Sequence, residues 1–215
     1  MNQKTSKISS LNKSNYHHGD LRSTLINEAT AILKESGVEG LSLRKLADKA
    51  GVSRTAPYHH FKDKNQLLCT IAEQGFVRWQ NDAESIFNRD DLSAHKKYRA
   101  FFHGYIQYAA DNPELYDLMF GRTIWKQNSA TEELKGVAFP CFHHQVEMTK
   151  RWQSQGVIPN NENTLRLSQV TWGTMHGIAR LLIDGIYADR THIDEMCDCA
   201  VNLFTQQLSI SNEVD

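Results

Sequence analysis

One short segment, residues 42–61 (SLRKLADKAGVSRTAPYHHF), combines polar side chains at helical spacing with a tight glycine turn. Four of these side chains stand at positions i, i+1, i+4 and i+5, which share one face of a helix: Arg54, Thr55, Tyr58 and His59. A guanidinium, hydroxyls and an imidazole are groups that hydrogen-bond base edges and phosphates. The segment therefore predicts a nucleic-acid-binding surface, and an ordinary helical hairpin with a polar surface is the alternative.

The histidines and cysteines lack the spacing of a catalytic or metal site. The histidine pairs are adjacent in sequence, so on a helix the two rings of a pair point about 100° apart. Cys197 and Cys199 lack the spacing of a zinc site, and the chain contains no HExxH, GxSxG or phosphate-cradling glycine motif. We predict no enzyme activity, no metal and no cofactor. An all-α metal- or cofactor-binding protein stays open as an alternative, as does a redox role for the two cysteines.

Helical periodicity positions the polar segment. Apolar residues from Leu21 to Leu33 predict a first helix that ends at Gly37. Ser42 is expected to cap a second helix, and Ser53 a third that reaches Phe61. Two short helices around Gly51 have the build of a helix-turn-helix, whose second helix enters the major groove. Asp63, with Gln66 three residues on, predicts the cap of a long fourth helix.

The rest of the chain repeats this helical pattern. Pro113 suits a first helical position, and Ser129 and Thr191 are each followed three residues later by an acidic side chain, as in a capping box. Breaks near residues 88–92, 121–129, 156–163 and 188–191 give about nine helices. No window alternates apolar and polar residues, so the predicted class is all-α.

Composition limits the protein class. The 215 residues are 40% hydrophobic and 23% charged, which is typical of a globular protein. Uncharged stretches such as residues 167–179 are shorter than the roughly 18 apolar residues of a membrane span. No secretory signal is visible, and four cysteines suggest a reduced compartment, so we expect a soluble, cytoplasmic protein.

The charge is unevenly distributed along the chain. Residues 1–65 hold 11 Lys and Arg against 6 Asp and Glu, a net charge of +5, whereas the remaining 13 basic and 19 acidic residues give −6. This asymmetry is expected when one end of a protein faces a polyanion, although chance clustering would also produce it.

The segment YHHGDLRSTLINEATAILKESGVEGLSLRKLADKAGVSRTAPYHHFKDKNQLL resembles the N-terminal domain of the tetracycline-repressor (TetR) family of bacterial transcription regulators. The resemblance covers residues 16 to about 75. It implies a three-helix DNA-binding head, a larger helical body, and a ligand-responsive homodimer that in most members represses transcription. The expected division is a flexible basic tail over 1–16, a DNA-binding domain over 17–75 with its motif at 42–61, and a regulatory and dimerisation domain over 76–215.

The family's DNA-contacting positions carry over to seven residues of this chain: Ser42, Arg44, Arg54, Thr55, Tyr58, His59 and Lys64. Tyr58 and Lys64 match positions that touch phosphate, and the dipole of the helix beginning at Lys64 adds to that attraction. Pro57 departs from the aliphatic residue of many members, so the recognition helix is expected to start with a slight distortion.

The body carries TWGTMHGIARLLIDG over residues 171–185, which resembles the C-terminal subgroup named for a Trp-His-Gly signature, here Trp172, His176 and Gly177. This helix is apolar nearly all round, so both its sides must be buried. Burial against a twin subunit, together with the stripe from Ile193 to Leu208, predicts a four-helix dimer interface. The alternative is the central helix of a monomeric bundle.

Aromatic side chains and a few histidines of the body predict a cavity for an apolar or amphipathic small molecule. Most of these side chains also suit an ordinary core. The candidate ligand-binding residues are Trp79, Phe102, His103, Phe120, Trp125, His143, Trp172 and His176.

Together these features predict a homodimeric, ligand-responsive transcription repressor whose partners are a palindromic double-stranded operator, a small-molecule effector and a second copy of itself. It is not expected to contact a membrane. A dimeric interaction module that no longer binds DNA is a further alternative.

Overall fold

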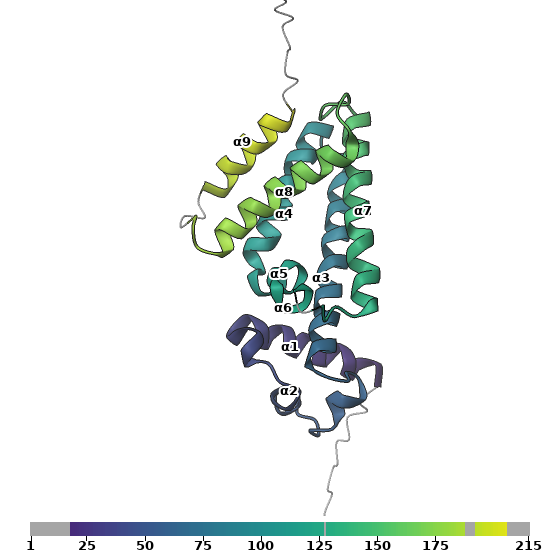
Figure 1. The fold of residues 1–215 in the computed structure, drawn as a ribbon, viewed down its shortest axis with the longest axis vertical. Coiled ribbons are helices and arrows are strands. Elements are labelled where there is room, and N and C mark those ends of the chain that lie inside the picture. Colours follow the sequence, from purple (N-terminus) through teal and green to yellow (C-terminus); the bar gives the residue numbers. More distant parts are fainter. Residues whose placement is uncertain (1–17, 127, 188–191, 206–215) are drawn as a thin grey trace, which may run out of the picture.

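A computed structural model describes residues 18–126, 128–187 and 192–205 of the chain. These residues form helices and connecting turns and contain no strand, so the predicted all-α class is confirmed. A small head and a longer body are stacked end to end (Figure 1). The head comprises α1 (His18–Gly40), α2 (Leu43–Lys49), a 3-10 helix η1 (Ala56–His59) and the start of α3 (Lys64–Phe87). The body adds α4 (Ala94–Asp111), α5 (Pro113–Phe120), α6 (Arg122–Trp125), α7 (Glu132–Ser154), α8 (Thr164–Ile183) and α9 (Ile193–Thr205).

Local signals in the head act as the sequence predicts. Gly37 interrupts α1 with φ +63°, a left-handed conformation that glycine adopts without a steric penalty. The Lys45 backbone N–H donates to Ser42 Oγ at 3.1 Å, so Ser42 caps α2. Behind these two helices lies a small apolar core that includes Leu46 and Phe61, both almost fully buried.

The expected α-helix from Ser53 to Phe61 is wrong, because the chain here forms only the four-residue η1. An α-helical bond to the Ser53 carbonyl would need a backbone N–H on Pro57, which proline lacks. Instead, the Ala56 N–H donates a hydrogen bond to the Ser53 carbonyl at 3.0 Å, and the Tyr58 N–H donates to the Thr55 carbonyl at 3.1 Å. These bonds span three residues rather than four, which is the 3-10 pattern. Ser53 caps nothing, and its hydroxyl lies 3.1 Å from that of Thr55.

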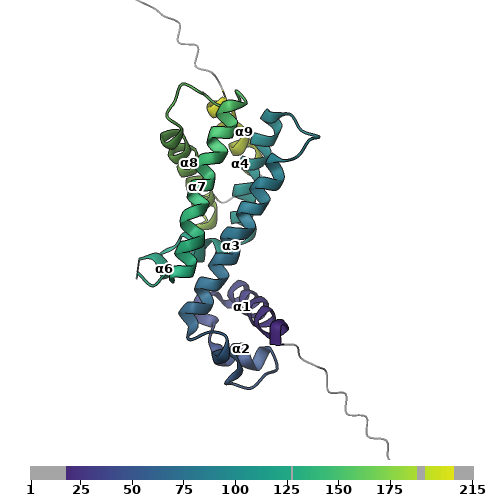
Figure 2. The same ribbon diagram turned by 90° about the vertical axis from the view of Figure 1, so that its right-hand side faces the viewer.

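The fourth helical element, α3, joins the head to the body without a break at residue 75 (Figure 2). Asp63 caps it by accepting the Gln66 N–H at 2.8 Å. The Gln66 side chain reaches back to the backbone N–H of Lys62 at 2.6 Å, one residue before the partner that a capping box normally uses. The predicted start of the helix is therefore confirmed.

In the body, α3, α4, α7 and α8 pack around an aromatic core, and α9 lies on α4. The short α5 and α6 lie at the end of the body nearest α1 (Figure 1). Trp152 and Tyr116 are among its largest fully buried side chains. Pro113 begins α5 as predicted. Thr131, not Ser129, caps α7, because the Ser129 hydroxyl donates to the Ile124 carbonyl at 3.0 Å. The proposed cap at Thr191 and the predicted tail over 1–16 lie outside the described residues.

Among the helices of the described part of the chain, none combines the length and apolar character needed to cross a membrane.

Candidate functional site

The predicted DNA-contacting side chains lie on the surface of the head. Six of the seven are exposed, and Lys64, the first residue of α3, is half-buried: Ser42, Arg44, Arg54, Thr55, Tyr58, His59 and Lys64. Tyr58 is 57% exposed although it is a large aromatic residue. Neighbouring Pro57 and Phe61 turn inward and are buried, so they anchor the segment that presents Tyr58 and His59 to solvent.

The charge around this surface is positive. Residues 42–64 contain six Lys and Arg and two Asp, a net charge of +4. One of the two acids, Asp63, is occupied as the cap of α3. The other, Asp48, lies 3.8 Å from Arg54 Nε, and both side chains are more than half exposed. A solvent-exposed ion pair at this distance contributes little to stability, so a phosphate or a base edge can replace Asp48 as the partner of Arg54.

The second candidate site is a group of adjoining carbon-lined cavities in the body. The largest has a volume of about 550 Å³ and is walled by Met119, Phe120 and Trp125 from α5 and α6 and by aromatic side chains of α3, α7 and α8. A neighbouring cavity of about 470 Å³ shares Phe120, Phe142 and Trp172 with it and adds His176. A small inner one of about 30 Å³ reaches Trp79. The structure thus brings six of the eight predicted ligand-binding residues together: Trp79, Phe120, Trp125, His143, Trp172 and His176.

Phe102 and His103 lie elsewhere. Phe102 is fully buried and packs against Phe204 of α9, with ring centroids 6.2 Å apart. The two ring nitrogens of His103 lie 3.0 Å from Asp194 and 3.1 Å from Asp198, which ties α4 to α9. Neither residue lines the three cavities.

A chain of hydrogen bonds runs behind the cavity wall. Trp172 Nε1 lies 2.9 Å from the Tyr105 hydroxyl, which lies 2.9 Å from the Tyr116 hydroxyl. The Tyr116 hydroxyl lies 2.5 Å from His176 Nδ1. Burial, and then the positive charge of Arg180, lower the pKa of His176, so its ring is neutral at pH 7.

Sequence reasoning missed several members of this site. Phe76 and Phe142 belong to the aromatic pattern of the body, but helical spacing alone does not separate cavity walls from core. Tyr105 and Tyr116 are 11 positions apart on different helices, and their pairing depends on how α4 meets α5. No local signal could have indicated it.

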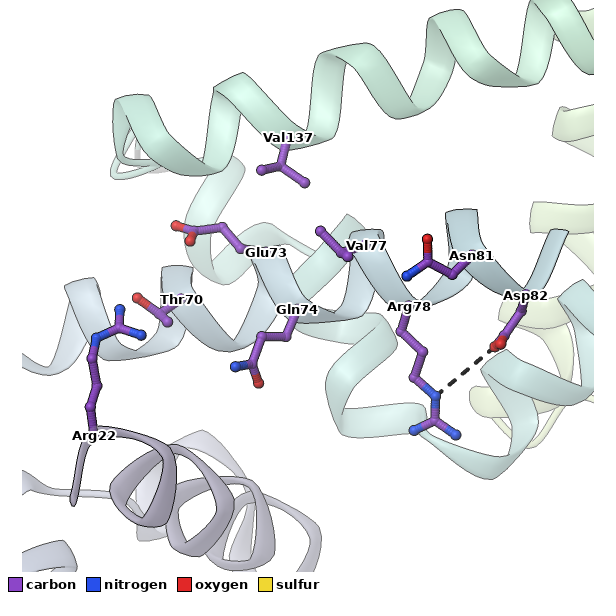
Figure 3. A pocket seen from close by; sticks show the side chains of 9 residues that line it. All are labelled: Arg22, Thr70, Glu73, Gln74, Val77, Arg78, Asn81, Asp82 and Val137. Atoms are coloured by element: carbon purple, nitrogen blue, oxygen red, sulfur yellow. Dashed lines mark ion pairs between the residues drawn. The ribbon is translucent and has the colours of Figure 1, made fainter. Parts of the chain in front are cut away.

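A polar groove of about 500 Å³ lies where the head meets the body (Figure 3). Arg22 of α1 lies near one end of a row of α3 side chains, and Val137 of α7 lies across from Glu73 and Val77 in the same row. Burial, and then the charge of Glu133, raise the pKa of Glu73. The groove is therefore lined by both the head and the body.

Direct contacts also join the largest cavity to the head. Trp125 Nε1 donates to the Met119 carbonyl at 2.7 Å, which holds α6 against α5. In the loop that follows α6, the Ser129 carbonyl accepts from Asn65 Nδ2 at 2.7 Å, in the first turn of α3. Helix α5 in turn packs on α1. Helix α5 and the loop after α6 therefore contact both α1 and the first turn of α3.

One edge of α8 remains uncovered. On this edge Val170 is 57% exposed, whereas Met175 and Ala179 on the opposite side are fully buried. A Cβ added at Gly173 or Gly177 would meet no atom within 4 Å. On α9, Leu203 is 69% exposed, and the predicted end of its stripe at Leu208 lies outside the described residues.

Within the described ranges, no group of three or more His, Cys, Asp or Glu side chains is arranged to hold a metal ion. Cys197 is buried and Cys199 exposed, and neither forms a disulfide. Burial raises the pKa of the Cys197 thiol to about 12, which disfavours the reactive thiolate.

Two family models match this chain. Residues 25–69 match the model described as bacterial regulatory proteins, tetR family, and residues 98–204 match the tetracyclin repressor-like C-terminal domain. The first match contains most of the head, including η1, and the second contains most of the cavity walls. The Trp-His-Gly subgroup stays a prediction.

Similar proteins agree with these matches. The class A tetracycline repressor of Escherichia coli is 41% identical over 68 residues, which are 32% of this chain and 31% of that protein. The chain spans a third or less of the length of the tetracycline repressors that it matches.

Matches to solved structures extend over most of the chain. A protein of unknown function from Rhodococcus sp. RHA1 is 32% identical, covers 90% of this chain and 100% of its own, and has a TM-score of 0.78. The regulator FadR from Bacillus subtilis in complex with stearoyl-CoA shares the fold, with 16% identity, 86% and 97% coverage and a TM-score of 0.61.

Proposed function

The chain belongs to the tetR family of bacterial regulatory proteins, and from this premise we propose that it is a homodimeric repressor that binds a palindromic operator and releases it when a small apolar molecule occupies the body. The family consists of transcriptional regulators and not of enzymes. The observation that carries the proposal is the exposed, positively charged surface around η1, supported from behind by buried Pro57 and Phe61.

We assign DNA contact to the head. Arg54, Thr55, Tyr58 and His59 are proposed to enter the major groove, with Arg54 reading a base edge. Ser42, Arg44 and Lys64 are proposed to contact the DNA backbone. A hydroxyl and two cations near the starts of helices can hydrogen-bond to phosphate oxygens. Since η1 is only one short turn, the base contacts come from a bend and not from a long recognition helix.

The effector is proposed to bind in the carbon-lined cavities, among Phe120, Trp125 and Trp172. Phe120 and Trp125 belong to α5 and α6; α5 packs on α1, and the loop after α6 is bonded to the first turn of α3. A ligand that binds one position of α5 and α6 more tightly than another would shift the population of head orientations. This mechanism requires the separation or mobility of the two heads to change with DNA affinity.

Dimerisation is proposed to use the uncovered edge of α8 with α9. Exposed Val170 and Leu203, and the open backbone at Gly177, allow a second α8 to approach closely. In this arrangement two heads bind two half-sites, about one helical turn of DNA apart. The division into residues 17–75 and 76–215 serves as a functional boundary within the continuous α3, and a cytoplasmic location follows from the proposed role on DNA.

The test is fluorescence anisotropy of the protein on DNA from upstream of its own gene, with scrambled DNA beside it and several salt concentrations. We expect tight, sequence-selective binding. Arg54→Ala should weaken it by about 1–3 kcal/mol and relax specificity at one base position. Lys150→Ala, which removes an exposed cation of α7 in the body, is the matched control and should leave binding unchanged.

Failure has a defined meaning in this experiment. Equal weakening by Arg54→Ala and Lys150→Ala would show that only general electrostatics are measured. An absence of binding at low salt to a genomic DNA library as well would replace the proposal with the interaction-module alternative.

A further inference from the structure

The walls of the three cavities contain no formally charged side chain. Their polar members are histidines, glutamines, a tyrosine and a cysteine, and the rest is carbon, mostly aromatic. Arg180, the cation beside His176, is already paired with Asp117 and Asp184. A charged ligand would therefore lose part of its hydration without gaining an unpaired counter-ion, which is unfavourable. This chemistry favours an uncharged ligand.

The hydrogen-bond chain behind the wall has a direction. The Trp172 indole N–H can only donate, so the Tyr105 oxygen accepts from it. If Tyr105 then donates to Tyr116, the Tyr116 proton is left for His176 Nδ1, and every proton in the chain has an acceptor. If Tyr116 donated to Tyr105 instead, the hydroxyl proton of Tyr105 would have no acceptor in the described structure. Tyr105 is only 3% exposed, so water would not readily supply one.

This direction determines what His176 offers on its other side. A neutral imidazole that accepts at Nδ1 carries its single proton on Nε2. No hydrogen-bond partner for Nε2 is present among the described residues, and the ring lines the cavity that also holds Gln169. Stacking on Tyr116 and edge contact with Phe120 hold the ring in this orientation.

We infer that His176 Nε2–H is a fixed hydrogen-bond donor for the effector, and that the effector is an uncharged, largely apolar molecule carrying an acceptor oxygen of the carbonyl type. The inference rests on the proposed function, because it assigns the ligand class of the proposed effector cavity. In it, His176 contacts the ligand, whereas Tyr116 and Tyr105 are positioning residues that select the tautomer. The acyl-CoA of the FadR complex is a different class, because CoA carries several negative charges.

The test uses four probes on one apolar body: 2-ethylnaphthalene, 2-acetylnaphthalene, 2-naphthoate and 2-naphthylmethylammonium. Binding to the full chain is followed by calorimetry, with quenching of tryptophan fluorescence as a second readout. The ketone is expected to bind more tightly than either ion, because only the ketone accepts a hydrogen bond without requiring a counter-ion.

Variants isolate the hydrogen bond. In His176→Phe, the preference for the ketone over the hydrocarbon should fall on the order of 5-fold, the effect of one hydrogen bond between neutral groups. His143→Phe removes another histidine from the cavity wall, one outside the hydrogen-bond chain, and should keep the preference. If His176→Phe does not fold, His176→Gln and His176→Asn form a second pair. Gln carries a donor to the outer position, and Asn is too short to do so.

The tautomer is measured without any ligand. Nitrogen-15 NMR of histidine-labelled protein distinguishes a protonated ring nitrogen from a bare one, and we expect Nε2 protonated and Nδ1 bare in His176. In Tyr116→Phe, the donor to Nδ1 is lost, so the two tautomers should mix and the ketone preference should shrink. A change in packing alone would not move the tautomer.

Three results would overturn the inference. The first is a protonated Nδ1 in the unmodified protein, and the second is a ketone preference that survives in His176→Phe. The third is an absence of binding by both the hydrocarbon and the ketone, which would also remove the proposed cavity. A ketone that binds through His176 without releasing operator DNA would support the inference and refute the effector mechanism instead.

Discussion

Substituting Gly177 by alanine has opposite expected effects on the single chain and on the dimer. Within the chain, the added Cβ meets no atom within 4 Å. The position lies inside α8, where alanine is favoured over glycine by about 0.5–1 kcal/mol because it loses less backbone entropy on folding. The folded subunit should therefore become slightly more stable.

In the proposed dimer the same methyl group lies where a second α8 approaches. Overpacking a close contact costs about 1–3 kcal/mol. Two-fold symmetry places the substitution in the interface twice, so the cost is about 2–6 kcal/mol and the dimer dissociation constant rises at least roughly 30-fold. Val170 on the neighbouring surface would be exposed again in the separated subunits.

Sedimentation equilibrium measures the dissociation constant, and far-UV circular dichroism checks the fold. Gly136→Ala is the matched control, because its added Cβ in α7 also meets no atom within 4 Å. The control should gain the same helix stability and keep the dimer. Equal dissociation constants for the two variants would refute the reasoning, since the open glycine edge of α8 would then lie outside the interface.

Three further predictions concern stability. Tyr98→Phe should leave the free energy of unfolding in urea unchanged or raise it by up to about 2 kcal/mol, because the buried Tyr98 hydroxyl has no partner among the described residues. Tyr108→Phe should lower the free energy of unfolding by about 1 kcal/mol, because it removes the 3.1 Å hydrogen bond to the Gly75 carbonyl. A larger loss for Tyr98→Phe than for Tyr108→Phe would contradict this prediction. Gly75→Ala should lower the melting temperature relative to Gly136→Ala, because its Cβ would lie 2.6 Å from Sδ of buried Met119, and equal melting temperatures would disprove the overlap. The Arg99 guanidinium, and then His103, hold the pKa of Asp198 at about 2, below its ordinary value, so the stability from this pair is present above about pH 4 and is lost as the pH falls toward 2. The difference in melting temperature between the unmodified protein and Asp198→Asn should therefore shrink over that range, and a constant difference would show that the pair does not hold α9.

Local features of the head were predictable because each depends on a few neighbouring residues. Ser42 and Asp63 accept backbone N–H groups three residues on, and Gly37 adopts a left-handed conformation, all within one turn of chain. The exposure of Arg54 and Tyr58 was predicted from helical spacing, but the structure achieves it with a turn in which Pro57 and Phe61 are buried. Pro57 signalled a distortion, but its extent, a 3-10 turn in place of a helix, depends on which carbonyl the next available N–H reaches.

The sequence by itself determined the helical class, the helix starts at Ser42 and Asp63, and the surface of the head, since these depend on contacts between residues close along the chain. Only the tertiary structure decided which histidine faces a cavity. His103 and His176 have similar apolar surroundings in sequence, yet one is held by two carboxylates of α9 and the other by Tyr116. Those partners are 60 to 95 positions away, and their distances are set by the packing of α4, α5, α8 and α9, which no local pattern encodes.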